Sequence, residues 1–169
     1  MNGYLGKEFQ SAFQHGSIYV GIESDSVFEN LVSETNHVQF SADSIIIYGK
    51  SMGTGIAAEL ASTTSCKRLI LETPYYDFPA VIRHYLPIYP VRWMLHYQIP
   101  TYEYLQNVSA PITIFHGTSD MVVSYRNTNR LKPLLKTVDE VVTIEGGHHN
   151  DLYDFPLVVN KLDSLLRLP

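Results

Sequence analysis

Residues 44–62 read SIIIYGKSMGTGIAAELAS, and their pattern predicts a strand, a turn and a helix. The apolar run at 45–48 is rich in β-branched residues and too short for a helix, so it predicts a buried strand. Residues 55–61 carry Ala, Leu and Glu, which predict a helix. Between them, residues 49–53 form a Gly-x-Ser-x-Gly turn. A strand, a sharp turn and a helix are the context in which such a turn presents a nucleophile, so Ser51 is the candidate.

The glycines and the following helix are the features of this turn that would make Ser51 reactive. A serine at such a turn is held in a strained backbone conformation, and only glycine lets the flanking strand and helix approach closely. The hydroxyl of Ser51 would then stand at a helix N-terminus, where the helix dipole favours developing negative charge. The alternative is an ordinary serine in a glycine-rich turn between a strand and a helix.

Length and composition predict one globular domain that spans residues 1–169. Hydrophobic residues make up 45% of the chain and charged residues 17%, which is ordinary for a soluble protein. The net charge of −5 argues against a nucleic-acid partner. The single cysteine, Cys66, excludes an internal disulfide and fits a reducing compartment. Because no apolar run is long enough for a membrane span and residues 1–16 do not read as a signal peptide, we expect a cytoplasmic protein.

Short apolar runs alternate with helical segments along the rest of the chain. We expect strands near residues 44–48, 67–72, 111–116 and 140–144, and helices near 18–31, 52–62, 124–135 and 155–168. Strands that alternate with helices form a parallel sheet with right-handed crossovers. The sequence therefore predicts an α/β fold with a mostly parallel sheet.

Three kinds of reactive side chain follow the ends of predicted strands. Ser51 follows the first of these strands, Asp120 the third, and the pair His148 and His149 the fourth. In a parallel sheet, ligands bind at the carboxyl ends of the strands, so these side chains are expected to meet there. The order Ser, Asp, His along the chain is also the order of a known catalytic triad. We therefore expect a Ser–His–Asp site at this edge of the sheet.

An aromatic segment separates the second predicted strand from the third. Residues 74–105 are rich in tyrosine and contain five prolines, which predict several short helices. Such an insertion can form a cap that shapes a pocket above the sheet, and its predicted substrate-binding residues are Tyr75, Tyr76, Tyr85 and Trp93. The alternative, equally weighted, is that these aromatic residues only cover the edge of the core.

Three segments together resemble the α/β-hydrolase superfamily of serine hydrolases, in particular its serine aminopeptidase-like branch. Members of that branch read YGRSLG around the nucleophile, HGTxDxVVP around the acid and GGGHND around the histidine. The matching segments here are YGKSMG (48–53), HGTSDMVV (116–123) and GGHHND (146–151). The resemblance covers about residues 41–168 and implies a three-layer sandwich with a short helical cap. The family's first strands and its HGN-type oxyanion loop have no counterpart here, so we expect an N-terminally short domain.

The resemblance implies acyl transfer from a small-molecule acyl substrate, an ester, thioester or amide, through an acyl-enzyme. It implies Ser51 as nucleophile, Asp120 as the acid that orients the imidazole, and the backbone N–H of Met52 as an oxyanion donor. The family pattern places the catalytic histidine directly before Asn-Asp, which selects His149 and leaves His148 where glycine is usual. This mechanism needs no metal or cofactor, and the seven histidines show no metal-ligand spacing.

Two classes of function stay open on the sequence. The first is a serine hydrolase with carboxylesterase, thioesterase or peptidase-like activity. The second is a catalytically weak or inactive α/β-hydrolase fragment or interaction module, because the second oxyanion donor normally comes from the loop without a counterpart. Loss of one such donor lowers turnover by about 10²–10³-fold in a characterised case.

Overall fold

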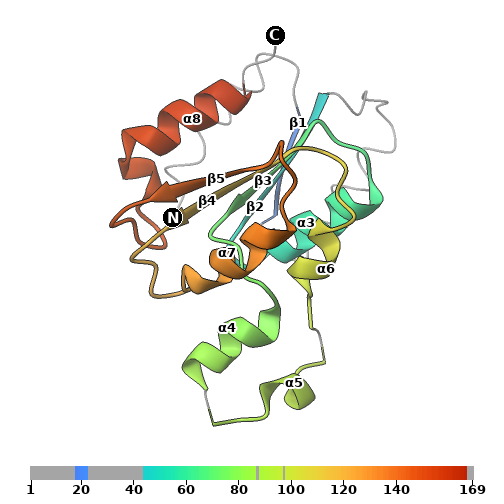
Figure 1. The fold of residues 1–169 in the computed structure, drawn as a ribbon, viewed down its shortest axis with the longest axis vertical. Coiled ribbons are helices and arrows are strands. Elements are labelled where there is room, and N and C mark those ends of the chain that lie inside the picture. Colours follow the sequence, from blue (N-terminus) through green and yellow to red (C-terminus); the bar gives the residue numbers. More distant parts are fainter. Residues whose placement is uncertain (1–17, 23–43, 87, 97, 167–169) are drawn as a thin grey trace.

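The computed structural model describes residues 18–22, 44–86, 88–96 and 98–166, and its centre is a parallel sheet (Figure 1). Within these residues, five strands lie in the same order in the sheet as in the chain, and every neighbouring pair is parallel. They are β1 (Ile18–Ile22), β2 (Ile45–Lys50), β3 (Arg68–Glu72), β4 (Ile112–Gly117) and β5 (Glu140–Ile144). The prediction of an α/β fold with a parallel sheet is therefore confirmed.

Helices cover both faces of the sheet and complete a three-layer sandwich (Figure 1). The helices of the described residues are α3 (Gly53–Thr63), α4 (Phe78–Tyr85), α5 (Val91–Met94), α6 (Thr101–Leu105), α7 (Arg126–Leu131) and α8 (Pro156–Leu166), with the 3₁₀ helices η2 (Lys132–Leu134) and η3 (Leu152–Asp154). One face packs against α3, α6 and α7, and the other against η3 and α8. Within the described ranges, no helix is both long and apolar enough to cross a membrane.

The strand register brings the functional loops to one edge of the sheet. Lys50 at the end of β2 pairs with Glu72 at the end of β3, and Gly117 at the end of β4 pairs with Ile144 at the end of β5. Because the strands are parallel, the loops that follow them leave the sheet on the same side. These loops carry the predicted serine, acid and histidine.

The segment Ile18–Ile22 is a correction to the sequence analysis. We expected it to begin a helix over residues 18–31, but it forms β1 and pairs in parallel with β2. Its Ile, Tyr and Val side chains favour extended backbone, and pairing with β2 outweighs a loose helical periodicity. Residues 23–31, the rest of that predicted helix, lie outside the described residues.

The other elements agree with the predictions within a few residues, with two differences in the helices. The helix after the nucleophile begins at Gly53, and Met52 is its N-cap residue. The predicted helix 124–135 is shorter, because α7 ends at Leu131 and a 3₁₀ turn with proline at its start follows. Proline cannot supply the backbone N–H that would continue the α-helical pattern.

The aromatic segment at residues 74–105 forms the three short helices α4, α5 and α6 between β3 and β4. Helix α4 begins where the Asp77 side chain accepts the N–H of Ala80 at 2.6 Å, a regular N-cap. Helix α6 lies beside α3, whereas α4 and α5 extend away from the sheet (Figure 1). The segment thus combines part of the core with a projecting lobe.

Candidate active site

Ser51 lies at a sharp turn between β2 and α3, in the left-handed region of backbone space with φ 51°. That conformation is strained for a residue with a side chain, so the surroundings must hold it. The N–H of Ser51 donates to the carbonyl of Glu72 at 2.9 Å. Thr54 donates both its N–H, at 3.0 Å, and its hydroxyl, at 2.6 Å, to the carbonyl of Ser51. The turn is therefore fixed on both sides.

Gly49 explains how the strand and the helix come so close at this turn. A Cβ atom at Gly49 would lie 2.6 Å from the Cβ of Ala57 and 2.6 Å from the carbonyl oxygen of Gly53. Neither contact is sterically possible, so only glycine fits there. This is the steric role that the sequence pattern predicts for the first glycine of the turn.

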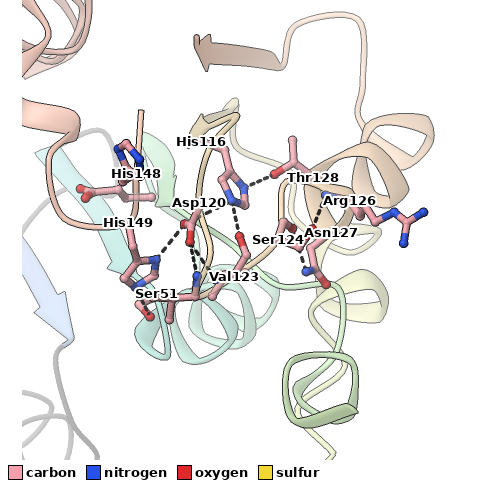
Figure 2. A network of polar contacts seen from close by, with 12 residues as sticks. Ser51, His116, Asp120, Val123, Ser124, Arg126, Asn127, Thr128, His148 and His149 are labelled. Carbon is pink, nitrogen blue, oxygen red and sulfur yellow. Dashed lines mark hydrogen bonds and ion pairs between the residues drawn. The ribbon is translucent and has the colours of Figure 1, made fainter. Parts of the chain in front are cut away.

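The ring of His149 lies between Ser51 and Asp120 (Figure 2). Its Nδ1 is 2.8 Å from Oδ2 of Asp120, and its Nε2 is 3.0 Å from Oγ of Ser51. A carboxylate only accepts, so the proton of a neutral imidazole belongs on Nδ1, and Nε2 then accepts the hydroxyl proton of Ser51. The arrangement gives a serine hydroxyl a base that is already in the right tautomer.

The carboxylate of Asp120 is anchored from several directions (Figure 2). Its Oδ1 accepts the backbone N–H groups of Val122 and Val123, both at 2.8 Å, and Oδ2 faces the rings of His149 and His116. Burial opposes ionisation of this side chain. Hydrogen bonds from His116, His149 and Val123 outweigh the burial and hold the pKa of Asp120 well below its usual value. Asp120 is therefore a charged acceptor across the neutral pH range.

His116 holds the loop that follows β4 and carries Asp120, which we call the acid loop. The sequence predicts no chemical role for His116. It is fully buried, with Nδ1 at 2.6 Å from the hydroxyl of Thr128 and Nε2 at 2.8 Å from the carbonyl of Val123. Its Nε2 lies 3.5 Å from Asp120. The sequence signal was its place at the end of a strand, just before the acid. Both ring nitrogens of His116 have protein partners, and the described ranges hold no group of three His, Cys, Asp or Glu able to bind a metal ion.

Hydrogen bonds join the acid loop to the loop that follows β5 and carries His149. The N–H of Ser119 donates to the carbonyl of Gly147 at 2.9 Å, and the N–H of Gly146 donates to the hydroxyl of Thr118 at 2.9 Å. A Cβ atom at Gly117 would lie 2.1 Å from the carbonyl oxygen of Gly147. Glycine at the end of β4 thus permits the approach that brings Asp120 and His149 together.

His148, the other histidine of the pair, has a different surrounding. Its side chain is exposed, its Nδ1 lies 2.9 Å from Oδ2 of Asp151, and its N–H donates to Oδ1 of Asp151 at 2.6 Å. Figure 2 shows the His148 ring apart from the hydrogen bonds between His149 and Ser51. The contacts of His148 with Asp151 stabilise the loop after β5. The imidazole ring next to Ser51 is that of His149.

Met52, the predicted backbone oxyanion donor, is the N-cap residue of α3. The first backbone N–H groups of a helix have no acceptor within the helix, so they can bind an anion. The hydroxyl of Tyr75 donates to the carbonyl of Met52 at 3.1 Å, which helps to fix this peptide. Tyr75 has no accessible surface. The structure therefore gives Tyr75 a packing role in place of the substrate contact that the sequence predicts.

The remaining predicted substrate-binding residues are not gathered in one place. Tyr76 packs against the core, and its ring makes a cation–π contact with the exposed Arg130, whose Cζ lies 3.6 Å from the ring centre. The Tyr85 hydroxyl donates to the carbonyl of Val122, next to the acid, at 3.0 Å. The Trp93 side chain is 92% exposed on α5. Of these three, Tyr85 is the one with a contact to the loop that holds Asp120.

The family of the chain follows from these features and from a direct match. A model of the alpha/beta hydrolase domain matches residues 23–153, and the chain belongs to this family. Alpha/beta hydrolase domain-containing protein 17C of Mus musculus is 25% identical over 131 residues, which are 75% of this chain and 38% of that protein. Alpha/beta hydrolase domain-containing protein aho-3 of Caenorhabditis elegans is 27% identical over 141 residues, 83% of this chain and 40% of that protein. The chain thus spans about two fifths of the length of these relatives.

Solved structures share the fold. A puromycin-hydrolysing peptidase of Mycobacterium tuberculosis matches with a TM-score of 0.61 and 16% identity, over 83% of this chain and 23% of that one. The esterase domain of a Rhodothermus marinus protein matches with a TM-score of 0.54 and 16% identity, over 81% of this chain and 63% of that one. At this level of identity the likeness concerns the fold, which is that of an α/β hydrolase.

Proposed function

We propose that the chain is a serine hydrolase that cleaves an ester, thioester or amide through an acyl-enzyme on Ser51. The observation that carries the proposal is the unbroken hydrogen-bonded series from Asp120 through His149 to Ser51. Its members come from three different loops at one edge of the sheet. Membership of the alpha/beta hydrolase family supports the same reaction class.

In the first step, Oγ of Ser51 attacks the carbonyl carbon of the substrate. The hydroxyl proton moves to Nε2 of His149, the carbonyl π electrons move to the oxygen, and a tetrahedral intermediate forms. Asp120 stabilises the imidazolium through its contact with Nδ1. Collapse of the intermediate breaks the bond to the leaving group, which receives the proton from Nε2.

In the second step, water takes the place of the leaving group. Nε2 of His149 accepts a proton from water as its oxygen attacks the acyl-enzyme, and then returns the proton to Oγ of Ser51 as the acid product leaves. The negative oxygen of both intermediates needs donors that are already in place. The N–H of Met52 at the start of α3 supplies one of them in this proposal.

The second candidate function is a catalytically weak or inactive α/β-hydrolase domain that acts as an interaction module. It is supported by the family resemblance, which implies a second oxyanion donor from a loop without a counterpart in the matched motifs. One missing donor leaves the chemistry intact but slows it by about 10²–10³-fold. A weak hydrolase would therefore differ from the first candidate in turnover and not in the identity of the nucleophile.

The substrate class follows from the reaction that the site supports. A triad of this kind acts on carbonyl compounds with a leaving group, and the proposed partner is a small-molecule acyl substrate. In this proposal Tyr85, whose hydroxyl donates to the carbonyl of Val122 near Asp120, helps to shape the approach to the site. The similar structures include a peptidase and an esterase, which fits cleavage of an amide or an ester.

An acylation burst with p-nitrophenyl acetate tests this proposal. We expect a burst of p-nitrophenol equal to the enzyme concentration, then slower turnover, with the acetyl group found by mass spectrometry on the peptide that contains Ser51. Ser51→Ala should abolish the burst, and Ser62→Ala, at the far end of α3, should leave it unchanged. A burst that survives in Ser51→Ala would contradict the proposal. A burst and a turnover that are both very slow would favour the weak hydrolase, because a missing oxyanion donor affects both intermediates.

A further inference from the structure

We propose that Glu72 is a positioning residue that keeps the nucleophile Ser51 and the base His149 at hydrogen-bond distance from each other. This inference rests on the proposed function. Its carboxylate is the centre of a group that we call the Glu72 cluster, made of Tyr48, Lys50, Glu72 and Tyr153. The cluster joins the strand before Ser51 to the helix after the His149 loop. No step of the proposed reaction uses any of these four side chains.

The contacts of the cluster surround one buried carboxylate. The side chain of Glu72 is 1% exposed and lies at the carboxyl end of β3. Lys50 places its Nζ 2.8 Å from Oε1. The hydroxyl of Tyr153 donates to Oε2 at 2.8 Å, and the hydroxyl of Tyr48 donates to the same oxygen. The two tyrosine oxygens are themselves 2.6 Å apart.

The three partners of Glu72 offset the cost of burying its carboxylate. An unpaired charge in the interior is costly, and Lys50 supplies the opposite charge while the phenols supply donors. Burial, followed by the negative charge of Glu72, raises the pKa of Tyr48, so this phenol keeps its proton at neutral pH. The ammonium of Lys50 also lies 5.5 Å from the ring centre of Tyr153. Glu72 is therefore the centre of the cluster, with a contact to each of its other three members.

The position of the cluster connects both halves of the triad. Lys50 directly precedes Ser51, and the carbonyl of Glu72 accepts the N–H of Ser51 at 2.9 Å. Tyr153 lies on η3, which follows the loop that carries His149. Glu72 thus holds the nucleophile through its backbone and the base through the hydroxyl of Tyr153. The two bonds meet in one residue at the end of β3.

A buried ion pair is weak evidence for stability, because apolar residues of similar volume often stabilise a core as well or better. Precise positioning is a stronger reason to keep polar groups at this place, because a displacement of about 1 Å at a reacting group can cost about 10²-fold in rate. The contact that depends on this positioning is the 3.0 Å hydrogen bond between Oγ of Ser51 and Nε2 of His149. Loss of one cluster contact should therefore slow the reaction of Ser51 more than it weakens substrate binding.

Tyr153→Phe is the sharpest variant, because it removes one hydroxyl and leaves the ring and the buried charge pair in place. The measurement is the rate of Ser51 labelling by a fluorophosphonate at increasing probe concentration. We expect the maximal labelling rate to fall about tenfold and the half-saturating probe concentration to stay the same. Tyr104→Phe is the matched control, since Tyr104 lies on α6, outside the cluster. It should label at the wild-type rate.

Amide hydrogen exchange tests the same inference without any activity. In Tyr153→Phe, the N–H groups of Ser51 and His148 should exchange about tenfold faster than in the wild type, and those of β4 should not change. Both N–H groups are hydrogen-bonded in the structure, to Glu72 and to Asp151. If wild-type Ser51 never labels but the exchange changes as expected, the proposed function fails and the positioning role stands. Unchanged exchange, or a labelling rate equal to that of Tyr104→Phe, would overturn the role of Glu72.

Discussion

Asp120 and His149 are 29 residues apart in the chain, yet Oδ2 of the first lies 2.8 Å from Nδ1 of the second in a buried contact. Two parallel strands make this possible, because β4 and β5 end side by side and send their loops to the same edge. The contact fixes which imidazole nitrogen faces Ser51.

The pH dependence of stability should reveal the charge on Asp120. Its pKa is lower in the folded chain than in the unfolded chain, so its ionisation stabilises the fold above the unfolded pKa of about 3.9. That contribution is lost as the pH falls further toward the folded pKa. We expect Asp120→Asn to be less stable than the wild type near neutral pH, and the difference to shrink below about pH 4. Urea unfolding across this range measures it, and a constant difference would contradict the assignment.

The two adjacent histidines should behave differently when each is removed. His149→Ala takes away the base beside Ser51 and should lower the rate of fluorophosphonate labelling by about 10²–10⁴-fold. His148→Ala removes an exposed ring that contacts Asp151, so labelling should stay near the wild-type rate. The two variants are matched in size and position. Equal losses in both, or a larger loss in His148→Ala, would show that the wrong histidine has been assigned.

The left-handed backbone at Ser51 predicts an order of stability between two inactive variants. Both Ser51→Gly and Ser51→Ala remove the hydroxyl, but glycine adopts φ 51° freely and alanine does not. We expect Ser51→Gly to unfold with a free energy about 1 kcal/mol higher than Ser51→Ala. Chemical denaturation measures the difference. An alanine variant as stable as the glycine variant would mean that the turn carries no strain.

Much of the fold, and the approach of Ser51, His149 and Asp120 to one another, could be predicted because both rest on local patterns. The strand, turn and helix around Ser51 are encoded within residues 44–62, and the order Ser, Asp, His is visible along the chain. The parallel sheet followed from the alternation of strands and helices. By contrast, Ile18–Ile22 forms a strand, because its pairing with β2 is a long-range effect that periodicity does not report.

The surroundings of the triad could not be predicted for the same reason. Glu72 and Tyr153 are 81 residues apart, and nothing in either local sequence indicates that they share a hydrogen bond. Tyr75 and Trp93 were both predicted to bind substrate, but one is fully buried and the other almost fully exposed. Composition located the aromatic segment, whereas the direction of each ring depends on packing between distant elements.

Covalent labelling by a fluorophosphonate shows whether Ser51 is an activated nucleophile. We expect the wild-type protein to gain one probe per chain, on the peptide that contains Ser51, because His149 accepts its proton at 3.0 Å. Ser51→Ala should take up none, and Ser62→Ala should label as the wild type does. A folded, monodisperse wild-type protein whose Ser51 remains unlabelled would contradict the account.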